Sequence, residues 1–212
     1  FQWQTTVQPL QAQAGAGWQL HSPEHGPEAQ RYQAVLLAVP APQAAPLLEA
    51  VTPEAATLAR SAPMRACWSV MVRCPQPVPL PVDGCFVEHS PLRWIARDSS
   101  KPGRSGPETW LLHASHAWSE AHVHDEAAAV TAALLQAFAQ LGGPDPASVQ
   151  ATAHRWLYAD TAPPLNVDGW WQPETGLGLC GDWLHNGTVE GAWLSGRHLA
   201  QRVHTTLATR TA

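Results

Sequence analysis

The 212-residue chain has few charged side chains and almost no lysine. Charged residues make up 14% of the sequence, Lys101 is the single lysine, and the formal net charge is −5. Without a basic stripe, the chain has no electrostatic footprint for nucleic acid. It also contains no apolar run of the roughly 18 residues that a membrane-spanning helix needs. We therefore expect neither nucleic acid nor a membrane as a partner.

Cysteine is scarce, and its spacing fits no common metal or redox motif. The four residues, none in a C-x-x-C pair, are Cys67, Cys74, Cys85 and Cys180. In a chain of this length they are more typical of buried free thiols in a cytoplasmic protein than of a disulfide framework. The G-x-S-x-G elbow of serine hydrolases is absent as well.

A glycine-rich loop between a strand and a helix is also missing. That loop lets the backbone approach a dinucleotide pyrophosphate. The spacing G-x-G-x-x-G occurs once, at Gly176, Gly178 and Gly181, and there it falls before and within a predicted strand. The chain also opens at Phe1 inside strand-like sequence. The start at Phe1 leads us to expect a fragment, a processed chain or a domain.

Hydrophobic periodicity predicts an order of strands and helices. The apolar segment Tyr32–Val39 is typical of a strand buried on both faces. Two short helices are expected over residues 41–62, and the second begins at Thr52 and Pro53. Alternating segments over residues 64–115, Leu92–Arg97 among them, predict an antiparallel sheet. Further strands are expected at Thr5–Gln13, Gly17–Leu20 and Val149–Trp156.

The clearest helical pattern runs from Glu126 to Leu141. Apolar residues recur there at every third or fourth position, which is the spacing of one helix face. Asp125 is the expected cap at its start, and Gly142 ends it. A loop is expected over residues 159–175.

The C-terminal segment combines a buried strand, an acidic residue and a helix start. The strand Leu177–Trp183 contains Gly181 and Asp182 near its carboxyl end, and Thr188 and Glu190 open the last helix. The first turn of a helix has unsatisfied N–H donors and a partial positive charge. A carboxylate beside such a turn suits a ligand that presents hydroxyl groups and an electron-rich acceptor.

This segment resembles the closing flavin segment of the amine-oxidase-like flavoprotein superfamily. Over its whole length the chain resembles bacterial renalase-like FAD-dependent oxidoreductases. Besides the C-terminal segment, the likeness lies in Tyr32–Ala44 with its Pro-x-Pro turn, in Trp94–Arg104 and in His154–Ala159. The N-terminal dinucleotide-binding segment of such proteins has no counterpart here.

The resemblance implies an α/β (α+β) fold in two parts. Residues 1–40 and 176–212 are expected to form the remnant of an FAD-binding Rossmann-type domain. Residues 41–175 are expected to form an antiparallel-sheet substrate domain with covering helices. An exposed edge at Tyr32–Val39 would favour a homo-oligomer.

The resemblance also implies roles for individual residues. Asp182 would accept a hydrogen bond from the ribityl or pyrophosphate region of FAD, and the N–H groups of Val189 and Glu190 would face the pyrimidine edge of the flavin. The full set implied to bind FAD is Val7, Gly181, Asp182, Thr188, Val189 and Glu190. The set implied for the substrate pocket is Trp94, Arg97, His154, Trp156 and Tyr158. No catalytic acid or base and no metal ligand is assigned.

The implied reaction is oxidation of a small molecule with oxygen as acceptor. The substrate would be a dihydronicotinamide of the NAD(P)H type or an amine. Arg97, Lys101 and Arg104 form a basic loop that could meet a dinucleotide phosphate, although a solvated loop explains them equally well. Because the glycine-rich loop is missing, we expect this chain to hold FAD weakly or not at all, and to be inactive alone.

Three alternatives remain at this point. A metal-dependent hydrolase could use the polar cluster of residues 113–126, in which His122 and His124 would share one side of an extended segment. The members of that cluster are His113, His116, His122, His124, Asp125 and Glu126. The chain could instead be a non-catalytic binding module, or a partner chain could supply the missing half of an FAD site.

Overall fold

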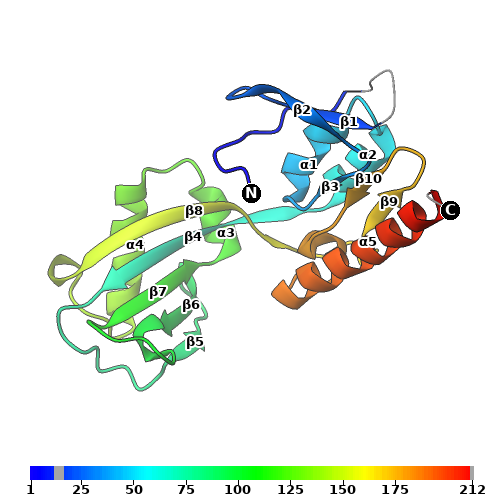
Figure 1. Ribbon diagram of the computed structural model, residues 1–212. Helices are drawn as coiled ribbons and strands as arrows, with labels where there is room; N and C mark the ends of the chain where they lie inside the picture. Colours follow the sequence, from blue (N-terminus) through cyan, green and yellow to red (C-terminus); the bar gives the residue numbers. More distant parts are fainter. Residues whose placement is uncertain (12–16, 211–212) are drawn as a thin grey trace. The chain divides into compact units, whose positions relative to one another are not determined.

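The computed structural model describes residues 1–11 and 17–210, and the chain divides into two compact units (Figure 1). Unit 1 comprises Phe1–Met64 and Asp160–Ala212, and unit 2 comprises Arg65–Ala159. These boundaries differ from the expected ones at residues 40 and 176. The reason is that the two short helices after residue 40, and Leu165 and Trp170, pack into the core of unit 1.

A three-stranded mixed sheet forms the centre of unit 1. Its middle strand, β10 (Leu177–Leu179), runs parallel to β3 (Val35–Leu37) and antiparallel to β9 (Trp170–Gln172). The prediction of a long strand over Tyr32–Val39, buried on both faces, is wrong. Tyr32 ends the preceding strand of a hairpin, β3 covers only three of the other residues, and Leu36 keeps 44% of its surface exposed.

Helices cover both faces of this sheet. α1 (Ala41–Leu48) and α2 (Pro53–Ser61) pack on the face that carries the two leucines of β10. α5 (Val189–Arg210) packs on the opposite face, where a Cβ atom placed on Gly178 would lie 2.8 Å from Leu199 Cδ1. The glycine in the middle of β10 therefore lets α5 approach the sheet closely.

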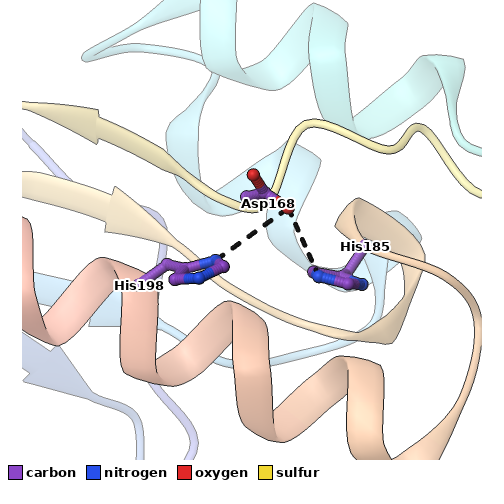
Figure 2. A group of neighbouring side chains, drawn as sticks. All are labelled: Asp168, His185 and His198. Carbon is purple, nitrogen blue, oxygen red and sulfur yellow. Dashed lines mark ion pairs between the residues drawn. The ribbon is translucent and has the colours of Figure 1, made fainter.

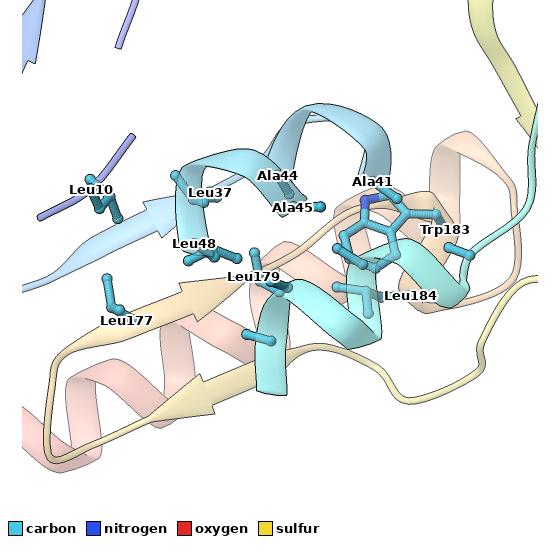
Figure 3. Close-up of a cluster of buried hydrophobic side chains, with 14 of the residues drawn as sticks. Leu10, Leu37, Ala41, Ala44, Ala45, Leu48, Leu177, Leu179, Trp183 and Leu184 are labelled. Atoms are coloured by element: carbon cyan, nitrogen blue, oxygen red, sulfur yellow. The ribbon is translucent and has the colours of Figure 1, made fainter. Parts of the chain in front are cut away.

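The main core of unit 1 lies between β10 and α1 (Figure 3). Leu48, Leu177, Leu179 and Trp183 are each at most 1% exposed. Burying one such leucine contributes roughly 1.5–3 kcal/mol relative to leaving it exposed. Besides Leu48, the buried residues of α1 are small and allow close packing: Ala41, Ala44 and Ala45.

A hairpin completes unit 1. Strands β1 (Trp18–Ser22) and β2 (Gly26–Tyr32) pair antiparallel, with a bulge between Gln19 and His21. The strand expected over Thr5–Gln13 is not present in its described part, residues 5–11. That segment is joined to the hairpin by a hydrogen bond in which the Gln8 N–H donates to His21 O at 2.9 Å. Residues 12 and 13 of the expected strand lie outside the described residues.

Unit 2 is built on a five-stranded sheet in the order β5-β6-β7-β4-β8. One face is covered by α4 (Ala127–Gln140), whose Leu134 and Phe138 are fully buried. The Phe138 ring packs against Trp110 with 5.3 Å between ring centroids. The strands are β4 (Met64–Arg73), β5 (Gly84–Phe86), β6 (Leu92–Arg97), β7 (Thr109–Ala114) and β8 (Gln150–Thr161).

Shorter helices connect these elements. They are η1 (Asp98–Ser100), α3 (His116–Ala121), η2 (Pro146–Ser148) and η3 (Asp182–Leu184). The cap expected for α4 at Asp125 is wrong. The helix begins one residue later than that cap requires, so Glu126 occupies the cap position, and its side chain makes no capping hydrogen bond.

The four cysteines are free thiols, and Cys67, Cys74 and Cys180 are buried. Among the helices of the described residues, none combines the length and the apolar character that crossing a bilayer requires.

Candidate functional site

The segment that follows β10 is hydrogen-bonded to helix α5. The Gly181 N–H donates to Ser195 Oγ of α5 at 3.1 Å. A Cβ atom on Gly181 would lie 2.7 Å from Trp183 Nε1, so only glycine fits there without a shift of the tryptophan. Trp183 is 1% exposed and donates its Nε1–H to Val39 O at 3.1 Å. Asp182, between these two anchors, is therefore held at a fixed place and is half-buried.

The loop after Asp182 returns the chain to the start of α5. The Asp182 carbonyl accepts hydrogen bonds from the His185 N–H at 3.0 Å and the Gly187 N–H at 2.9 Å. Gly187 takes a φ of 72°, in the left-handed region that glycine adopts most readily. This tight turn places the acidic residue and the first turn of α5 at the two ends of one short loop.

Thr188 caps α5. Its Oγ1 accepts the Gly191 N–H at 2.9 Å and donates to Asn186 Oδ1 at 2.6 Å, while its carbonyl accepts the Ala192 N–H at 2.9 Å. The cap thus satisfies the donors deeper in the first turn. Within the described residues no protein group accepts the N–H of Val189 or Glu190.

These two N–H groups stand at the positive end of the helix macrodipole. The side chain of Val189 is 92% exposed, so a ligand can reach the backbone beside it. The arrangement suits an acceptor that carries or develops negative charge, with a carboxylate close by for hydroxyl groups.

Val7 lies elsewhere in unit 1. It lines a pocket of about 280 Å³ beside the β1–β2 hairpin, together with Leu20, His21 and Tyr32. None of residues 181–190 lines this pocket. The six residues expected to bind FAD therefore occupy two places within the same unit.

The five residues expected in the substrate pocket do not form one cluster. Trp94 and Arg97 lie on β6, whereas His154, Trp156 and Tyr158 lie on β8. β7 and β4 separate these strands in the sheet. Neighbouring strands are about 4.8 Å apart, so the two groups are separated by roughly 14 Å. Sequence reasoning missed this separation because it depends on strand order.

Arg97 is bound within its own unit. It pairs with Glu108 at 3.0 Å, donates to Leu80 O at 2.5 Å and lies over the Trp110 ring at 4.8 Å, and its side chain is only 19% exposed. The other two cations of the basic loop, Lys101 and Arg104, both pair with Asp98. The expected phosphate-binding charges are therefore largely compensated by neighbouring acids.

The three β8 residues form an exposed aromatic surface. Their alternate positions place them on one face of the strand. The His154 and Trp156 rings are in contact, with 4.3 Å between centroids, and Trp156 and Tyr158 are 54% and 38% exposed. Nearer the start of β8, Gln150 and Thr152 line a pocket of about 690 Å³ that also includes Met71, Arg73 and Leu111.

The alternative metal centre built on residues 113–126 is wrong. His122 and His124 lie in a turn that follows α3 and not in an extended segment. The His122 ring stacks on Trp118 with 3.9 Å between centroids, and the His116 Nδ1 atom lies 3.0 Å from Ala66 O. His113 lies on β7, where burial, followed by the charges of Arg93 and His116, lowers its pKa below 6.5. Of the six residues, the three just named have packing contacts, His124, Asp125 and Glu126 are exposed, and the set does not converge on one point.

A different group has the geometry of metal ligands. Within residues 1–11 and 17–210, the one set of three or more potential metal ligands that converge is Asp168, His185 and His198. They are far apart in the sequence, and no sequence motif links them.

Comparison with known proteins identifies the family and the fold. The family model of flavin containing amine oxidoreductases matches residues 12–204. A cyclohexylamine oxidase from Brevibacterium oxydans superposes with a TM-score of 0.71 at 16% identity, over 96% of this chain and 48% of that one. An oxidoreductase from Methanosarcina mazei superposes with a TM-score of 0.63 at 12% identity, over 93% of this chain and 49% of that one. A putrescine oxidase bound to putrescine superposes with a TM-score of 0.62 at 13% identity, over 98% of this chain and 49% of that one.

The chain spans about half the length of these solved structures, and likeness at such identities shows the fold alone. The predicted mixed α/β class with antiparallel sheets and helices is confirmed. Since the family model covers most of the sequence, the chain belongs to the flavin containing amine oxidoreductase family.

Proposed function

We propose that this chain supplies one wall of an FAD site in a renalase-like oxidoreductase. Its substrate is a dihydronicotinamide of the NAD(P)H type, and oxygen is the electron acceptor. The observation that carries the proposal is the capped start of α5, where the N–H groups of Val189 and Glu190 are unused and Asp182 lies at the other end of the same short loop.

The residues present fit an isoalloxazine ring and its ribityl chain. The N–H groups of Val189 and Glu190 would donate to the pyrimidine edge, and the helix terminus would stabilise negative charge there. Asp182 would accept from a ribityl hydroxyl group. When bound, FAD supplies the acceptor for the two electrons of the substrate, so the protein needs to contribute orientation, exclusion of water and electrostatics.

Unit 2 offers groups suited to the substrate. His154, Trp156 and Tyr158 provide flat ring surfaces on β8, and such surfaces suit a planar ring such as nicotinamide. The nearby pocket of about 690 Å³ is of the size that holds a small organic molecule, and its wall includes the cation of Arg73. These features support the dihydronicotinamide proposal.

A small amine is the second candidate substrate. The family itself, and the likeness to a cyclohexylamine oxidase and a putrescine oxidase, favour it. Exposed aromatic rings such as Trp156 also attract a cationic amine through their faces. The two candidates separate in an assay of peroxide formation by an FAD-loaded protein that contains this chain. We expect peroxide with a dihydronicotinamide, and peroxide with amines alone would select the second candidate.

The flavin-binding wall can be tested by removing one N–H group. Proline is well tolerated at the first position of a helix, where the N–H has no intrahelical partner. Val189→Pro therefore removes a donor but keeps the helix. A hydrogen bond to a charged group is worth about 1.5 kcal/mol or more, which is roughly tenfold in affinity. We expect Val189→Pro to weaken FAD binding about tenfold, measured by flavin fluorescence.

Val189→Ala is the matched control, because it removes the same side chain and keeps the N–H group. It should bind FAD as the wild type does. Equal affinities for Val189→Pro and the wild type, with equal thermal stabilities, would contradict the proposed contact. We also expect the isolated chain to bind FAD weakly, so a purified chain carrying near-stoichiometric flavin would contradict that part of the proposal.

A further inference from the structure

Three segments of unit 1 bring Asp168, His185 and His198 together (Figure 2). His185 Nε2 lies 3.3 Å from Asp168 Oδ1, and His198 Nδ1 lies 3.9 Å from the same oxygen. One potential ligand atom from each residue falls within a span of 4.8 Å. The group comprises two imidazoles and one carboxylate.

The backbone fixes this arrangement. The segment before Asp168 runs alongside η3, because the Leu165 N–H donates to Trp183 O at 2.9 Å and the Val167 N–H donates to Leu184 O at 2.7 Å. His185 follows η3 directly. On α5, His198 precedes Leu199, which is 1% exposed and anchors that turn of the helix in the core. These backbone hydrogen bonds and the buried turn of α5 hold the three residues near one another.

The two spacings to Asp168 are close to those around a four-coordinate metal. Zinc binds imidazole nitrogen and carboxylate oxygen at about 2.0–2.2 Å in a tetrahedron, which places ligand atoms roughly 3.3 Å apart. The His185–Asp168 pair already has this separation, and the His198–Asp168 pair is 0.6 Å longer at 3.9 Å.

The surroundings favour a ligand at this point. The Nδ1 atom of His198 is shielded from solvent and has no hydrogen-bond partner among the described residues, although it faces the carboxylate. The Asp168 side chain is 64% exposed and that of His198 is 41% exposed, so water can complete the coordination. A pocket of about 310 Å³ opens beside Asp168, Gly169 and His198.

We propose that Asp168, His185 and His198 form a binding site for a divalent cation of the zinc class. Two imidazoles favour zinc, copper, nickel or iron over magnesium and calcium, which prefer oxygen ligands. Along α5, nine residues separate His198 from the start of the helix at Val189, about 13 Å at 1.5 Å per residue. His198 thus lies away from the proposed flavin contacts, whereas His185 lies in the loop that joins Asp182 to α5. Bound metal joins the segment of Asp168, the loop after η3 and α5, and so stabilises unit 1.

The test is zinc binding by the full chain. After treatment with a chelator, the chain is titrated with Zn²⁺ in competition with a chromophoric indicator, and thermal unfolding is followed with and without the metal. We expect one equivalent to bind and the melting temperature to rise with zinc concentration. Co²⁺ in the same site should give the intense visible absorption of a four-coordinate ion.

Variants decide whether these three residues hold the metal. His198→Gln and Asp168→Asn should each weaken binding roughly tenfold or more, and abolish the thermal shift. Asn tolerates the φ of 61° that Asp168 adopts, so the backbone is preserved. His204→Gln, an exposed histidine on the same helix, is the matched control and should bind zinc as the wild type does. Thermal unfolding of the three variants, measured in the presence of the chelator, verifies that each one is folded.

Two outcomes would overturn the proposal. One is the absence of stoichiometric zinc binding by the wild-type chain. The other is an equal loss of affinity in His198→Gln and His204→Gln, which would indicate scattered binding to surface histidines. Flavin affinity is not a readout here, so failure of the metal site and failure of the flavin proposal are separate results.

Discussion

The cap of α5 gives the sharpest prediction, because a single hydroxyl group organises the proposed flavin-binding turn. Thr188→Val replaces that hydroxyl with a methyl group of similar size. The Gly191 N–H, now 2.9 Å from Thr188 Oγ1, loses its acceptor, and Asn186 Oδ1 loses the donor at 2.6 Å. Removing an N-cap side chain typically costs about 1 kcal/mol.

We therefore expect the free energy of unfolding of unit 1 to fall by about 1 kcal/mol, which corresponds to a decrease in melting temperature of about 3 °C for a chain of this size. The bond to Asn186 is exposed and adds little to this value. Because the turn that orients the N–H groups of Val189 and Glu190 loses its anchor, FAD affinity should decrease as well. Urea unfolding and flavin fluorescence measure the two effects.

Thr205→Val on the same helix is the matched control. Its hydroxyl bonds back to Gln201 O at 3.0 Å and caps nothing. Both changes replace threonine by valine, but Thr205 lies within α5 and Thr188 precedes it, so the control shows what the same side-chain change costs where no cap is lost. Thr188→Ser should restore the stability, since serine is an equally good cap. Equal stabilities of Thr188→Val and Thr205→Val would refute the role given to the cap.

Three further predictions test the packing and the titration of buried groups. Gly178→Ala should destabilise unit 1 by about 1–3 kcal/mol in urea unfolding, because the new Cβ would lie 2.8 Å from Leu199 Cδ1; an unchanged midpoint would contradict the close approach of α5. The lowered pKa of His113 means that the unfolded chain binds its proton more readily, so stability should fall as the pH drops below about 6.5, and His113→Gln should reduce this slope. Burial, with a smaller contribution from the charge of Glu108, raises the pKa of Cys74 to about 11, so its thiol should resist a disulfide reagent in the folded protein and react after Cys85, which is half-buried.

Local signals in the sequence predicted local structure well. The strand Leu92–Arg97 has the expected bounds, and the helix predicted over Glu126–Leu141 is present over Ala127–Gln140. The helix start after Thr52 is also confirmed. These elements are specified by residues that are close together in the chain: apolar spacing, a proline at the first helical position and terminal glycines. A single sequence is therefore enough to predict them.

Errors occurred where a segment depends on distant partners. The apolar run Tyr32–Val39 predicts a long strand, but β10 offers only three paired positions to β3. β9 (Trp170–Gln172) lies inside the expected loop of residues 159–175, because it forms by pairing with β10. Propensity and periodicity do not report which strands will meet.

The two candidate sites of unit 1 differ in how far the sequence predicts them, because only one of them depends on distant partners. The turn from Asp182 to the start of α5 is continuous in sequence, so its polar loop, cap and helix could be predicted together. The group of Asp168, His185 and His198 is assembled by the pairing of β9 with β10 and by the packing of α5 on Gly178. No fixed spacing follows from such contacts. A histidine in the loop before α5, a histidine within α5 and an aspartate before a strand become a metal-ligand set only after the sheet and helix are in place. The zinc titration therefore also tests the packing of α5 against this sheet.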